Sequence, residues 1–164
     1  MLELKRISLD AVPEALAKAE RYRLLNEPAL AESICLDILE ADPANQAARI
    51  MLILALSDQS EDVATVNRAR EQVQKLNGEY ERTYYAGLVA ERTAIALLRQ
   101  GPGRGTSAYR SFGEAMEWYE QAEKIHPPGN DDAILRWNTC ARILNRNPGL
   151  EPHPDEAMQT ILDD

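Results

Sequence analysis

The chain has little of several residue types on which common functions depend. Its 164 residues include two cysteines, two histidines and one phenylalanine, and 18 Lys+Arg stand against 27 Asp+Glu, for a net charge of -9. Cys35 and Cys140 are too few and too far apart for a disulfide scaffold or a zinc knuckle, and they fit a reduced cytoplasmic setting. The shortage of basic residues argues against binding to bulk DNA or RNA, which requires a positive surface.

Long hydrophobic runs are missing too. The longest, residues 50–56, falls far short of the roughly 20 apolar residues that cross a bilayer. Asp10 interrupts the apolar stretch that a signal peptide would need after Lys5 and Arg6. With 45% hydrophobic and 27% charged residues, the composition is that of one globular domain. We therefore expect a cytoplasmic protein that binds neither membranes nor nucleic acid.

What the sequence does contain is helical periodicity. Apolar residues recur at helical spacing, turn signals separate the segments, and no run shows the strict alternation typical of half-buried strands. These features predict an all-α fold. The expected helices cover about residues 10–25, 29–41, 47–57, 61–76, 79–100, 109–125 and 133–145.

Caps and breaker residues set the expected helix boundaries. Asp10 is expected to cap the first helix, and Asn130 or Asp131 the last. The glycine-rich segment 101–107 is expected to be a flexible loop between helices. Segment 47–57 is apolar nearly all round, so its helix is expected to lie at the centre, covered by neighbours.

A spaced triplet recurs along the chain and indicates internal repetition. It consists of a small residue, a second residue one turn later and a third residue three positions further on. Its three copies are Ala31, Cys35 and Ile38; Ala69, Val73 and Leu76; and Ala115, Tyr119 and Ala122. Pro43 and Pro127 follow the first and third copies at the same distance. Helical hairpins that recur in this way are typical of a solenoid.

This pattern resembles the tetratricopeptide repeat (TPR), over about residues 11–146. Ala19 and Tyr22 in the first copy, and Phe112 in the third, also occupy positions where that family places small and aromatic residues. The resemblance implies a TPR-like solenoid of three helical hairpins plus a terminal helix. It also implies that the first helices of the hairpins line a groove that binds an extended peptide or a partner's helix, without chemistry.

The inner surface expected of these helices differs from that of one group within the family. Some members grip a C-terminal carboxylate with lysines and asparagines on the first helices. Here the corresponding positions carry Leu16, Glu20, Ile50 and Leu54. A chaperone-type carboxylate clamp is therefore not expected.

Arginine and tyrosine side chains mark a candidate partner-binding surface. Steps of three and four place Arg82, Tyr85, Val89, Arg92, Ala96 and Arg99 on one face of the long helix. The small residues Gly87, Ala90 and Ala94 lie opposite and suit close helix packing, which leaves the stripe to face a groove or solvent.

Tyr, Trp and Arg are enriched at interface hot spots. The predicted partner-binding residues are therefore Arg82, Tyr84, Tyr85, Arg92, Arg136, Trp137 and Arg142. Their charge favours an acidic peptide. Local pairing of the arginines with Glu91, Asp131 and Asp132 is the alternative interpretation.

The C-terminal segment is expected to be separate from the array that covers residues 1–146. Residues 147–164 form an acidic, proline-containing tail with no basic residue after Arg146. It is expected either to be disordered or to form a short helix through Met158, Ile161 and Leu162 that docks on the array or on a partner.

Three classes of function remain, and an interaction adaptor or scaffold is favoured. The alternatives are a structural subunit that self-associates through its helices and, less favoured, an enzyme or small-ligand carrier that uses loop 101–107. That loop lacks the lysine of a P-loop, and neither cysteine has an adjacent base to activate it. We therefore predict no enzymatic activity and no metal or cofactor, and the oligomeric state stays open.

Overall fold

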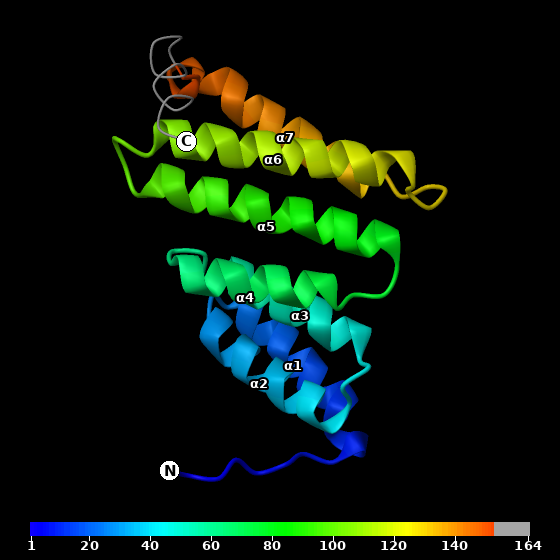
Figure 1. The fold of residues 1–164 in the computed structure, drawn as a ribbon. Helices are drawn as coiled ribbons and strands as arrows, with labels where there is room; N and C mark the ends of the chain where they lie inside the picture. The colour runs from blue at the N-terminus through cyan, green and yellow to red at the C-terminus, as the bar shows by residue number, and fades with distance from the viewer. Residues whose placement is uncertain (153–164) are drawn as a thin grey trace. The chain divides into compact units, whose positions relative to one another are not determined.

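The computed structural model describes residues 1–152, and within this range it contains helices and no strand. The helices are α1 (Val12–Leu24), α2 (Pro28–Ala41), α3 (Gln46–Ser57), α4 (Val63–Gln74), α5 (Glu79–Arg99), α6 (Gly105–Lys124) and α7 (Asp132–Arg146), with the 3-10 turns η1 (Leu9–Ala11) and η2 (Pro148–Leu150). The predicted all-α class is confirmed (Figure 1). No helix in the described part of the chain is long and apolar enough to span a membrane.

Most predicted boundaries lie close to the observed ones, but two local predictions are wrong. The loop predicted over 101–107 is shorter, because α6 already begins at Gly105. Asp10 does not cap α1: it lies in η1, and the N-cap position belongs to Ala11, which makes no side-chain cap bond. At α7 the N-cap position is Asp131, whose side chain makes no cap bond. Asn130, one residue earlier, accepts a 3.0 Å hydrogen bond at its Oδ1 from the backbone N–H of Asp132.

The chain divides into two compact units, one from Met1 to Tyr85 and the other from Ala86 onward. The division falls inside α5, so this helix contributes residues to both. Of the predicted tail, η2 packs against α6 and α7, so the packed part of the second unit extends beyond Arg146. The tail positions Met158, Ile161 and Leu162 lie outside the described residues.

Two helical hairpins make up most of the first unit. α1 packs against α2, α3 packs against α4, and both α1 and α2 contact α3. The turn between α1 and α2 is closed by Asn26, whose φ of 61° is left-handed. Around it, the backbone N–H of Glu27 bonds the carbonyl of Tyr22, and that of Asn26 bonds the carbonyl of Arg23. This is a Schellman motif, which satisfies carbonyls at the end of the helix.

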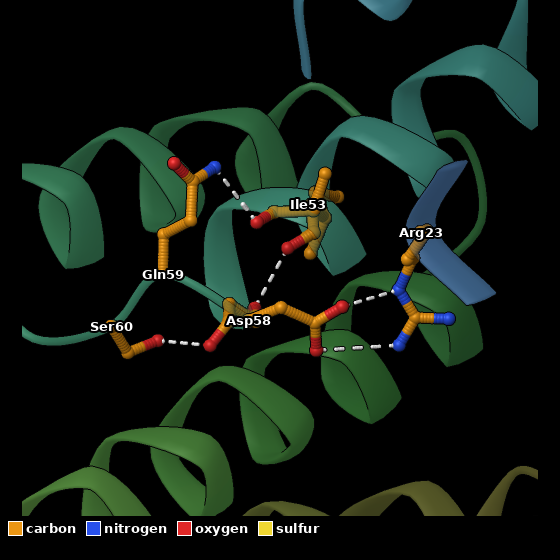
Figure 2. Close-up of polar contacts among 7 residues, drawn as sticks. Arg23, Ile53, Asp58, Gln59 and Ser60 are labelled. Carbon is orange, nitrogen blue, oxygen red and sulfur yellow. Dashed lines mark hydrogen bonds and ion pairs between the residues drawn. The ribbon is translucent and has the colours of Figure 1, made fainter. Parts of the chain in front are cut away.

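Polar pairs link equivalent helices of the two hairpins. Arg23 at the end of α1 binds Asp58 just after α3, with Nε 2.6 Å from Oδ2 and Nη2 3.4 Å from Oδ1 (Figure 2). Arg68 of α4 forms an ion pair with Glu32 of α2. The first helices of the two hairpins are thus joined by one pair, and the second helices by another.

The core of the first unit is centred on α3, as its all-round apolar sequence predicts. Its buried residues are Ala48, Leu52, Ile53, Ala55, Leu56 and Ser57. The hydroxyl of Ser57 donates a 2.7 Å hydrogen bond to the carbonyl of Ile53, so this buried polar group is satisfied. The side chain of Asn45 caps the helix by accepting from the N–H of Ala48 at 2.9 Å.

The three copies of the triplet occupy equivalent environments. They lie in α2, in or next to the end of α4, and in α6, and all nine side chains are at most 2% exposed. The small residues Ala31, Ala69 and Ala115 are fully buried. The spacing in the sequence therefore corresponds to a periodicity of burial.

Candidate partner-binding surface

The residues predicted to bind a partner lie on α5 and α7. Those on α5 before residue 86 belong to the first unit, and the rest belong to the second. Arg142 is exposed, whereas Arg82, Tyr84, Tyr85, Arg92, Arg136 and Trp137 are half-buried. Partial burial means that each of these six side chains already has contacts within the chain.

The arginine and tyrosine stripe on α5 is not one open face. Val89, at its middle, is fully buried. Residues 87–91 are all buried, and five consecutive helical residues point in all directions around the axis. The side chains at this level of α5 are buried, so the predicted exposure of the stripe is wrong there.

In the first unit, the aromatic residues at the start of α5 pack on one another. The rings of Tyr80 and Tyr84 are stacked with centroids 5.8 Å apart, and those of Tyr84 and Tyr85 meet edge to face at 5.0 Å. Arg82 Nη1 donates a 2.9 Å hydrogen bond to the carbonyl of Leu76. This arginine thus binds the segment that follows α4.

A buried carboxylate lies at the centre of the second unit. Glu91 of α5 is 1% exposed. Its Oε2 accepts a 2.5 Å hydrogen bond from the hydroxyl of Tyr119 on α6, and its Oε1 lies 3.2 Å from Nη1 of Arg136 on α7. Burying a charge is costly unless it is paired and hydrogen-bonded, and here each carboxylate oxygen has a partner. Glu91 therefore ties three helices together.

Burial keeps the neighbouring acidic groups in their neutral forms. Burial and the negative charge of Glu91 raise the pKa of Tyr119 far above its ordinary value. Burial, assisted by Glu91, raises the pKa of the Cys140 thiol to about 12, although the positive charge of Arg136 opposes the shift. Burial also raises the pKa of Cys35 to about 12. At neutral pH the phenol is a donor to Glu91, and the two thiols are unreactive packing groups.

Close backbone approach positions this cluster. A Cβ atom on Gly87 would lie 2.7 Å from Cε1 of Tyr119 and 3.2 Å from Cβ of Trp118. Contacts under about 3 Å are not tolerated between packed side chains, so α5 comes this near to α6 only with glycine here. The close packing predicted for Gly87 is confirmed.

The predicted residues on α7 divide into two groups. Arg136 has its charge offset by Glu91, 45 residues earlier in the chain. Trp137 Nε1 donates a 3.0 Å hydrogen bond to Glu120 Oε1 on α6. Arg142 lies six residues beyond Arg136, which is a rotation of about 120° around the helix. The structure therefore does not bring Arg142 onto the face of Arg136.

Sequence reasoning missed the role of Glu91. It treated this residue as a local neighbour of the arginines, whereas Glu91 is the buried partner of Arg136 and Tyr119. A usable signal was present, because Glu91 lies one turn after Gly87 on the packing face of α5. A carboxylate on a face of small residues indicates a buried acid that needs a donor from the adjacent helix.

Comparison of the chain with protein-family models, with curated protein sequences and with solved structures gives no significant match. The repeat pattern, the packing and the chemistry of the side chains are the grounds for a functional proposal. Among residues 1–152, no three histidine, cysteine or acidic side chains are grouped so as to hold a metal ion.

Proposed function

We propose that this chain is a protein-interaction module, built as a TPR-like array of helical hairpins, that binds a peptide or a helix of a partner protein. One observation carries the proposal: the first helices of consecutive hairpins are joined by Arg23 and Asp58, and the second helices by Arg68 and Glu32. Pairing of like helices is the arrangement expected when one hairpin repeats its neighbour.

The repeated triplet supports the same proposal. Each hairpin of a solenoid buries its apolar face only by stacking on the next one, so equivalent positions should be equally buried. The small residues of the three copies are all fully buried, which allows neighbouring helices to approach. The third copy, in α6, extends the pattern into the second unit.

The first helices offer partly accessible apolar side chains to a partner. α1 and α3 are in contact, and Leu16, Ile50 and Leu54 on them are half-buried, whereas Glu20 is exposed. Half-buried leucine and isoleucine side chains retain apolar surface that a partner could cover. An apolar face of the bound segment is therefore part of the proposal.

In the second unit, basic side chains are proposed as a contact of their own, separate from the apolar side chains of the first unit. Arg92 and Arg142 are the arginines proposed to contact acidic residues of the partner, and Trp137 is proposed as an aromatic contact. Arg136 has a different role, because its guanidinium holds the buried carboxylate of Glu91. It is proposed to position α7 against α5 and thereby to orient Trp137.

Selection of peptides against the full chain, followed by calorimetry, tests the proposal. Peptides that combine acidic and apolar residues should be recovered, and Arg92→Gln and Arg142→Gln should each weaken their binding by about fivefold or more. Arg21→Gln on α1 is the matched control, because Arg21 is exposed and its replacement changes net charge equally. Equal affinities in all three variants, or failure to recover any peptide, would contradict the proposal.

A further inference from the structure

Residues 1–8 form an arm that precedes η1 and contains no helical turn. Figure 1 shows it as the blue trace that leads into the start of α1. The arm is anchored at Ile7, which packs against the core cluster of Val12, Ile38 and Ala48. Before Ile7, all six side chains are exposed.

A cavity of about 470 Å³ lies between this arm and α2. The arm contributes residues 4–7 to its lining, and α2 contributes Leu36, Asp37, Glu40 and Ala41. Four of the eight lining side chains are apolar. The charged ones are sorted by sign, because the arm contributes Lys5 and Arg6 and α2 contributes the two acids.

The arm leaves apolar surface uncovered in its own chain. Met1, Leu2 and Leu4 are at least 89% exposed, and Leu36 on α2, which lines the cavity together with Leu4, is 46% exposed. Met1 and Leu2 do not line the cavity. The arm meets α2 through the ion pair of Arg6 and Glu40, 3.4 Å apart, with side chains 82% and 65% exposed. Such exposed pairs hold two segments together only weakly.

We propose that a second copy of this chain docks at this cavity in a two-fold arrangement. Met1 and Leu2 of each copy enter the cavity of the other and cover Leu36, and Lys5 of each copy faces Asp37 of the other. A two-fold contact requires a patch that is complementary to itself. The arm and the cavity fulfil that condition. One chain carries both the uncovered apolar side chains and the cavity that would receive them, and its cavity has a basic side on the arm and an acidic side on α2.

Sedimentation velocity of the full chain from about 1 to 200 µM tests the proposal, since dimerisation depends on concentration. The chain should change from monomer to dimer within this range. Replacing Leu2 and Leu4 together by serine should raise the dissociation constant about tenfold or more, because each buried leucine contributes to the interface. Leu24→Ser with Leu25→Ser is the matched control, since these leucines are 75% and 63% exposed at the other end of α1.

A charge exchange tests whether Lys5 and Asp37 contribute to the dimer. Asp37→Lys should weaken the dimer, and adding Lys5→Asp in the same chain should restore it, because the two-fold contact then pairs the same charges in reverse. A monomer at all concentrations would overturn the proposal. A dimer unaffected by the Leu2 and Leu4 replacements, or lost in the Leu24 and Leu25 control, would overturn it as well. None of these results depends on the proposed peptide binding.

Discussion

Gly87 of α5 lies so close to Tyr119 of α6 that a Cβ atom on the glycine would be 2.7 Å from Cε1 of the ring. Tyr119 cannot easily move away. It is fully buried, and its hydroxyl is held by the 2.5 Å hydrogen bond to Glu91. One glycine and one hydrogen bond thus determine how closely α5 and α6 pack.

Gly87→Ala is therefore expected to destabilise the fold, although alanine is the better helix former by about 1 kcal/mol. Overpacking against a fixed ring should reduce the free energy of unfolding by about 1–3 kcal/mol in urea denaturation. Gly113→Ala in α6 is the control, because a Cβ atom there meets nothing within 4 Å. The control should be unchanged or more stable. Equal stability of the Gly87 and Gly113 variants would show that the ring moves freely.

Arg136 is expected to stabilise the fold because it offsets the charge of the buried carboxylate of Glu91. Arg136→Met should lower the free energy of unfolding by about 2–3 kcal/mol, less than the full cost of a broken buried pair. The expected loss is smaller because the side chain of Arg136 is 33% exposed and therefore partly screened by solvent, whereas the side chain of Glu91 is 2% exposed.

The double variant Glu91→Gln with Arg136→Met gives the control for this pair. A neutral amide in place of the carboxylate removes the unpaired buried charge, so the double variant should be more stable than Arg136→Met alone. Thermal denaturation of the three chains is sufficient. If Arg136→Met costs nothing, the buried carboxylate of Glu91 is stabilised by Tyr119 and not by the arginine.

The buried thiols predict a loss of stability at alkaline pH. The pKa of Cys35 and Cys140 is raised from 9.0 to about 12 in the folded chain. Above the thiol pKa of the unfolded chain, the unfolded state binds fewer protons than the folded state, so stability must fall as pH rises from about 9 to 12. The slope is at most about 1.4 kcal/mol per pH unit for each thiol.

Alanine replacements separate the thiols from the tyrosines, which also lose protons at high pH. Urea denaturation of Cys35→Ala and Cys140→Ala at pH 8 and pH 11, in reducing buffer, should give a smaller decline than the unmodified chain shows. A decline of the same size in all three chains would assign the alkaline loss to other groups.

Asp62 gives the opposite dependence at acid pH. Its side chain caps α4 by accepting from the N–H of Thr65 at 2.9 Å, and hydrogen bonds with Thr65 lower its pKa below 3.8. Its contribution is complete above the pKa of the unfolded carboxyl and is lost as pH falls through the lower folded value. Asp62→Asn keeps a capping oxygen without the charge. Its stability should therefore fall less between pH 5 and pH 2, as measured by urea denaturation.

Local features of the fold follow from the sequence because they depend on near neighbours. The apolar residues on all sides of α3 predict a buried helix, and six of its residues are buried. The spacing of Ala31, Cys35 and Ile38 predicts that they are buried, and all three are. The start of α6 at Gly105 was missed, because glycine is a poor helix former and tertiary packing decided the boundary. Leu150 packs beside Gly105 there.

The candidate site was less predictable, because its contacts join distant parts of the chain. The helical period correctly placed Arg92 and Val89 on one face of α5, but it could not tell which neighbours cover that face. The partner of Arg136 is Glu91, 45 residues away, and no local spacing reveals such a pair. Residues used for internal packing and residues left for a partner have the same sequence signature, since arginine and tyrosine serve both roles.

The repeated small residues provide the last test. Ala31 and Ala115 are fully buried at equivalent positions of α2 and α6, where a larger side chain would force the helices apart. Ala31→Leu and Ala115→Leu should each lower the free energy of unfolding by about 1–3 kcal/mol.

Ala29→Leu is the control for this test, because Ala29 is exposed two residues earlier on the same helix, and it should be neutral. Ala69→Leu extends the test to the second copy, which is the one without a following proline. Similar losses at all three buried alanines, with none at Ala29, would mean that the three copies perform the same packing role. If Ala31→Leu and Ala115→Leu both left the thermal midpoint unchanged, the repeat would have no physical basis, because helix packing would then not require a small residue at these positions.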